Sequence, residues 1–158
     1  MPLDQNLPRW IFASVSKHFN ARRQGIPMFI EGQLRKTRTE EDFIELRVDG
    51  PYYTEISKGF WDVYIEINVL VQAAQDQADY HRIHKSVGVV AAAFTQAISI
   101  FKLGDNVGDD DSLVACLKLL GDKEKRDRIQ ISHFGQVEPE TGIFQATVEA
   151  HYEAQIRE

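Results

Sequence analysis

The sequence predicts an α+β fold, with a mostly antiparallel sheet, an N-terminal helix and one long helix packed on one face of the sheet. Apolar and polar residues alternate along residues 60–72 and again along residues 143–156, which is the period of strands with one buried face. Between residues 76 and 102, apolar residues recur every three or four positions, which predicts the long helix. No linker or repeat divides the chain, so residues 1–158 are expected to form a single domain.

The strongest strand signal runs from Gly59 to Gln72. One parity is apolar and mostly β-branched, and the other is largely polar. The apolar parity consists of Trp61, Val63, Ile65, Ile67, Val69 and Val71. This pattern predicts a long central strand with one dry face and one wetter face. Residues 143–156 repeat the pattern and are expected to lie beside it.

Residues 5–23 are expected to form an amphipathic helix, because apolar side chains recur every four residues. Asp4 or Asn6 would cap its start, Pro8 suits its first turn, and Gly25 would end it. The apolar stripe consists of Leu7, Ile11, Val15 and Phe19, with Trp10 beside it.

Shorter patterns predict the remaining strands. Residues 26–32 form an apolar run that Pro27 restricts to a sheet edge or a strand start. Asp49-Gly50-Pro51 is a turn by composition, so three consecutive antiparallel strands are expected at 43–48, 52–58 and 60–72. Residues 113–120 are apolar with no clear period. A strand at 128–134 and a turn at 138–142 complete a closing hairpin with residues 143–156.

Composition is that of an ordinary soluble globular protein, with 43% apolar and 27% charged residues. The net charge of −6 argues against broad binding to nucleic acid backbones, which needs clustered Lys and Arg. Cys116 is the only cysteine, which excludes an intramolecular disulfide and a Cys-rich metal site. The sequence has neither a signal-peptide pattern nor an apolar run of about 20 residues, so an intracellular protein without a membrane span is expected.

Three features of the sequence bear on a possible reaction or metal site. His81 and His84 lie three apart on the long predicted helix, and His133 or His151 would have to supply a third metal ligand. The acidic loop 105–112 lacks the spacing and the closing Glu of an EF-hand. No nucleophile signature surrounds Cys116, which we interpret as a small buried residue. We therefore expect no catalytic residue, no metal and no cofactor.

The order of elements resembles the tail terminator (tail completion) proteins of long-tailed bacteriophages, of the lambda type. The resemblance rests on a helix ending in Arg22 and Arg23, a long strand like 60–72, a helix entered through Gln75-Asp76-Gln77-Ala78-Asp79, and a closing hairpin like 129–156. It covers most of the chain and carries no diagnostic motif. Residues 104–127 depart from it, because that segment is longer than expected between the helix and the hairpin.

This resemblance implies a homo-oligomer, a hexameric ring that caps the finished tail tube and stops its polymerisation. One side of the ring would bind the tail tube protein, and the other a neck or head-completion protein. DNA would pass through the lumen without specific binding, repelled by an acidic protein. The protein would be assembled in the host cytoplasm and reside in the virion.

Two exposed, charged loops are the expected contact segments. Loop 33–42 carries Arg35, Lys36 and Arg38, and loop 104–112 carries Asp109, Asp110 and Asp111. Three alternatives stay open: another phage neck adaptor or baseplate protein, a non-viral protein-interaction module, and a metal-dependent enzyme that uses His81 and His84.

Overall fold

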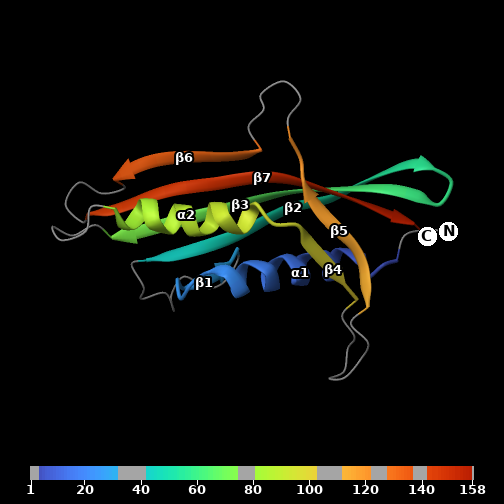
Figure 1. The fold of residues 1–158 in the computed structure, drawn as a ribbon, viewed down its shortest axis with the longest axis horizontal. Coiled ribbons are helices and arrows are strands. Elements are labelled where there is room, and N and C mark those ends of the chain that lie inside the picture. Colours follow the sequence, from blue (N-terminus) through green and yellow to red (C-terminus); the bar gives the residue numbers. More distant parts are fainter. Residues whose placement is uncertain are drawn as a thin grey trace.

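The structure, a computed structural model, describes residues 4–31, 42–74, 81–102, 112–121, 128–136 and 142–157 (Figure 1). Two helices and seven strands follow one another as α1 Leu7–Arg22, β1 Met28–Ile30, β2 Phe43–Ser57, β3 Phe60–Ala74, α2 Arg82–Phe94, β4 Ile98–Phe101, β5 Leu113–Leu119, β6 Ile129–Gln136 and β7 Ile143–Arg157. The α+β class and the mainly antiparallel sheet are confirmed. Neither of the helices in these ranges is long and apolar enough to cross a membrane.

The sheet is built on three long strands. Its strand order is β1-β2-β3-β7-β5-β4, with β6 also paired to β7, and only the β1–β2 pair is parallel. β7 pairs with β3 along its whole length, as the sequence predicts. The other edge of β7 is shared, because β6 pairs with residues 144–150 and β5 with residues 152–153. The edge position of β1 is confirmed as well.

The two faces of the central strand differ as the alternation predicts. Val63, Ile65, Ile67, Val69 and Val71 have no exposed surface, whereas the intervening side chains are half-buried. α2 packs on the buried face against β3 and β7, and α1 packs against β4, β2 and α2 (Figure 1). The predicted stripe of α1 is buried, including Trp10. The core therefore lies between the helices and this face of the sheet.

The predicted long helix over residues 76–102 is wrong in its second half. α2 ends at Phe94, where Thr95 donates from Oγ1 to the Ala92 carbonyl at 2.6 Å. Ile98 and Ile100 then alternate with less buried residues in β4, which pairs with β5. β-Branched side chains favour this extended backbone, and pairing with β5 outweighs the helical spacing. Residues 76–80 lie outside the described part.

The predicted turn at 49–51 is also wrong. β2 runs without interruption from Phe43 to Ser57 and accommodates these residues in a bulge between Asp49 and Tyr52. Gly50 has φ +106°, and the Gly50–Pro51 peptide bond is cis. A bulge inserts extra residues while pairing continues, so the same turn-forming composition serves a bent strand. Residues 113–120, ambiguous in the sequence, contain β5.

Candidate functional site

The predicted contact residues belong to two charged loops. Arg35, Lys36 and Arg38, and likewise Asp109, Asp110 and Asp111, lie outside the described residues. The structure therefore leaves the two contact loops as a prediction. The surfaces that it does describe are the outer face of the sheet, the histidines of α2 and β6, and the free strand edges.

The histidines of the metal alternative lie near one another. The His84 ring centroid is 5.0 Å from that of His133 on β6 and 6.3 Å from that of His81, and all three side chains are exposed. His133 is one of the two histidines that the sequence offered as a third metal ligand beside His81 and His84. Within the described ranges, however, no group of three or more His, Cys, Asp or Glu residues is arranged to hold a metal ion.

A polar surface covers the outer face of the sheet, the face opposite α2. It consists of the half-buried parity of β3 and the residues paired with it on β2 and β7. Its acidic side chains are Glu45, Asp49, Asp62, Glu66, Glu149 and Glu153, and its basic ones include Arg47, Arg157 and, on β5 beside Glu153, Lys118. The alternation along β3 and β7 predicted a wetter face. Which carboxyl groups lie together on it follows only from the strand register.

Tyr64, Glu66 and His151 form a polar cluster in the middle of this face. The Tyr64 hydroxyl donates to Glu66 Oε1 at 3.1 Å and lies 2.5 Å from His151 Nδ1, with the two rings stacked. A hydroxyl has a single proton, so Nδ1 must be the donor to Tyr64 when Tyr64 donates to Glu66. Burial, the bond to Glu66 and the Glu66 charge raise the pKa of Tyr64 to about 12. The hydroxyl therefore stays protonated at neutral pH and serves as a link between strands.

A second cluster pairs two carboxyl groups. Burial, the nearby charge of Asp62 and a hydrogen bond with Asp62 raise the pKa of Glu153. Such a bond requires one carboxyl group to carry a proton. A surface pocket of about 510 Å³ lies beside Glu153 and is lined by Cys116, Lys118, Leu120, Glu153, Ala154 and Gln155. Cys116 is half-buried at its wall, where its sulfur lies 3.8 Å from the Ser99 hydroxyl.

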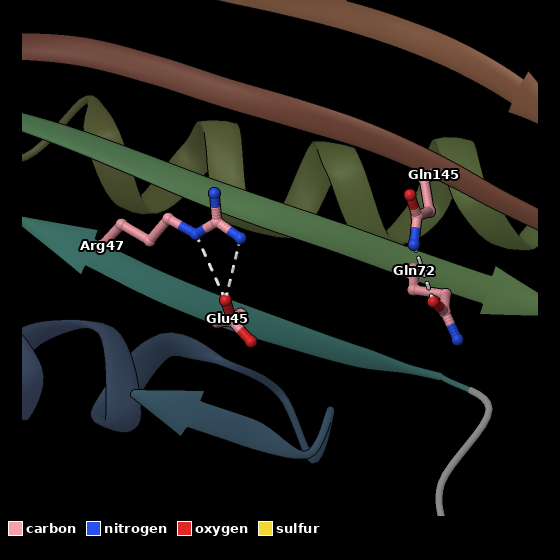
Figure 2. A network of polar contacts seen from close by, with 4 residues as sticks. All are labelled: Glu45, Arg47, Gln72 and Gln145. Carbon is pink, nitrogen blue, oxygen red and sulfur yellow. Dashed lines mark hydrogen bonds and ion pairs between the residues drawn. The ribbon is translucent and has the colours of Figure 1, made fainter. Parts of the chain in front are cut away.

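Figure 2 shows two further polar contacts across the outer face. Arg47 donates from Nε and Nη2 to Glu45 Oε1, at 3.2 and 3.0 Å. Gln145 on β7 donates to Gln72 on β3 at 2.9 Å. Glu45 is only 3% exposed, so its pairing with Arg47 offsets the cost of burying a carboxylate. These contacts join neighbouring residues of the sheet and leave its face polar.

The outer face is therefore a polar surface on which carboxyl groups outnumber the basic side chains of Arg47, Lys118 and Arg157. The pocket beside Glu153 does not include the Tyr64 cluster. No protein-family model matches this chain, and no curated protein matches it. The function is therefore argued from the surfaces alone.

Proposed function

We propose that this protein is a tail terminator of a long-tailed bacteriophage, a ring that caps the tail tube and stops its polymerisation. In this proposal the ring also provides the attachment surface for a neck or head-completion protein. The observation that carries the proposal is the outer face of the three long strands of the sheet, where carboxyl groups outnumber basic side chains, with both helices packed on or beside the opposite face. The order of elements supports it independently through the resemblance described above.

An acidic sheet face suits the wall of a DNA channel. Phosphates are repelled by Asp62, Glu66 and Glu149, so DNA would be kept in solution as it slides past. Hydrogen bonds such as Gln145 to Gln72 hold the polar side chains in place on the strands. A ring with this face inward would let the helices and loops meet partner proteins above, below and outside.

The proposal is tested by the mass of the purified protein and by its action on tubes. Light scattering and negative-stain imaging should show rings of about six copies, in solution or on tube ends. Added to polymerising tail tube protein, the chain should stop elongation and be found at one end of each tube. A chain that leaves tube length unchanged and does not bind tube ends would refute the proposal. Binding only to neck or baseplate proteins would favour the adaptor alternative.

A further inference from the structure

The hairpin of β2 and β3 forms an arm, defined here as residues 48–62, that projects from one end of the molecule (Figure 1). Most of its β2 strand is exposed, including Tyr52 and Ile56, each with 51% of its surface in solvent. Single exposed apolar side chains are common on proteins, and they indicate a contact surface where they gather beside another binding feature. The arm is therefore the first of two candidate contact surfaces.

The arm has a free strand edge. The Ile44 N–H donates to the Pro27 carbonyl, and the Leu46 carbonyl accepts from the Glu31 N–H. The backbone groups of even-numbered residues at the start of β2 therefore point away from β3. Before the bulge this alternation directs the backbone groups of Val48 away from β3. The bulge between Asp49 and Tyr52 shifts the alternation by one residue, so beyond it Tyr53 and Glu55 direct their backbone groups away from β3. β1 covers only residues 44–46, and no other described strand pairs with this edge.

Strand β6 has the second free edge. The Leu120 N–H donates to the His151 carbonyl, so the backbone groups of odd-numbered residues of β7 point towards β5 and β6. The register then pairs Gln130 and Ser132 with β7 through hydrogen bonds, and directs the backbone groups of Ile129 and Ile131 away from it. No described strand pairs with that edge. Ile131 and Phe134 are 44% and 61% exposed beside it.

The two edges cannot meet within one subunit. β2 and β6 lie on opposite sides of the paired strands β3 and β7, so their outer edges point away from each other (Figure 1). We propose that the arm of one copy adds to the sheet edge of β6 in the next copy. A contact between two different surfaces of identical chains is heterologous, and it closes into a ring when the rotation allows. The inference rests on the proposed function, because it supplies the subunit contact of the ring.

The two edges are complementary in chemistry. Each has outward backbone groups that pair with none of the described strands, and two large exposed side chains: Tyr52 and Ile56 on the arm, and Ile131 and Phe134 on β6. The arm carries Asp49 and Glu55 on β2, while residues 128–136 contain Arg128 and no carboxylate. Backbone pairing supplies affinity, and the side chains decide which edge is accepted. Pairing would also protect both edges from indiscriminate aggregation.

Cross-linking between singly labelled chains tests the contact. In a Cys116→Ser background, one chain carries Glu55→Cys on the arm and a differently tagged chain carries Ile131→Cys on β6. A short bis-maleimide linker should join unlike chains, because neighbouring strands lie about 5 Å apart. The double variant should form a ladder up to the closed ring. Lys17→Cys, exposed on α1, is the matched control and should not join to Ile131→Cys. Equal yields for like and unlike chains, or no cross-link, would overturn the inference.

Proline variants test whether the backbone edge is used. Ile131→Pro removes an outward N–H without removing a bond to β7, and edge strands tolerate proline at such positions. The dissociation constant of self-association should rise at least about tenfold. The circular dichroism spectrum should stay unchanged. Ile131→Thr keeps the N–H and should lose less. Glu55→Pro should repeat the loss from the other side. Assembly of both proline variants at the wild-type level would contradict the edge pairing.

Failure of the contact and failure of the proposed function give different results. Chains that cap tubes as rings but do not cross-link arm to β6 would refute only the contact. Chains that cross-link into rings and leave tube growth unchanged would refute only the terminator function.

Discussion

The Tyr152 hydroxyl donates a hydrogen bond to the Phe94 carbonyl at 2.5 Å, which joins the middle of β7 to the last residue of α2. Both side chains are fully buried, and the Phe94 ring also packs edge-on against Phe19 of α1 at 5.0 Å. This contact lies where the chain leaves the helix and enters β4. It satisfies a carbonyl at the helix end that has no partner within the helix.

Tyr152→Phe should therefore destabilise the fold. The substitution keeps the ring but leaves the buried Phe94 carbonyl without its donor, at a cost of about 1–3 kcal/mol. For a chain of this length the midpoint of thermal unfolding should fall by roughly 2–4 °C for each kcal/mol. Urea unfolding followed by circular dichroism measures the free energy directly.

Tyr53→Phe is the matched control for that prediction. The Tyr53 hydroxyl is buried and has no hydrogen-bond partner in the described structure, so its removal relieves a desolvation cost. We expect the free energy of unfolding to stay the same or to rise. A loss as large as that of Tyr152→Phe would show that burial of the hydroxyl, rather than the bond to Phe94, decides the effect.

His18 should make stability depend on pH. It is buried in α1, and its Nε2 donates to the Ala93 carbonyl at 2.9 Å. Burial lowers the pKa of His18, and the Arg22 charge lowers it further, against an opposing effect of the bond to Ala93. Between the folded pKa and about 6.5 the unfolded chain binds the proton and the folded chain does not, so stability rises with pH across this window. Acidification from pH 7 to pH 5 should therefore lower the free energy of unfolding.

His18→Gln separates this group from the other histidines. Glutamine places an amide N–H where Nε2 lies and does not titrate, so the bond to Ala93 can persist while the pH dependence is reduced. Urea unfolding of both proteins between pH 5 and 8 gives the comparison. Parallel curves for the two proteins would assign the pH dependence to other groups.

The parts of the fold that follow from local periodicity were predictable. β3, β7 and α1 each show one parity or stripe of apolar residues over many positions, and their buried faces match it. The end of α2 was missed because Ala97 and Phe101 continue the helical spacing, and only pairing of β4 with β5 makes the segment a strand. The acidic cluster was missed because Asp62 and Glu153 are far apart in sequence and meet through the β3–β7 register.

Asp42, just before β2, contacts both the end of β3 and the start of α2, and the sequence pattern does not predict these contacts. Its Oδ1 accepts from the Ala74 N–H at 2.8 Å, and its Oδ2 pairs with Arg82 at the start of α2. Asp42→Ala should cost about 1.5–3 kcal/mol, the range for hydrogen bonds to a charged group. Asp42→Asn retains an acceptor for Ala74 and should lose less. Hydrogen exchange of the Ala74 amide should accelerate in Asp42→Ala, and an unchanged rate would contradict the role of Asp42.

Glu153→Gln should stabilise the protein at neutral pH. Burial and the Asp62 charge raise the pKa of Glu153, so between the unfolded and the folded pKa the folded chain holds a proton that the unfolded chain has released. The favourable contribution of this pair is therefore complete below the unfolded pKa and is lost as pH rises through the folded pKa. Glutamine donates to Asp62 without carrying a charge, so the gain should appear at pH 7 and shrink towards pH 4. Thermal unfolding at both values measures it. An equal effect at the two pH values would show that packing at β7, rather than repulsion from Asp62, sets the stability at this site.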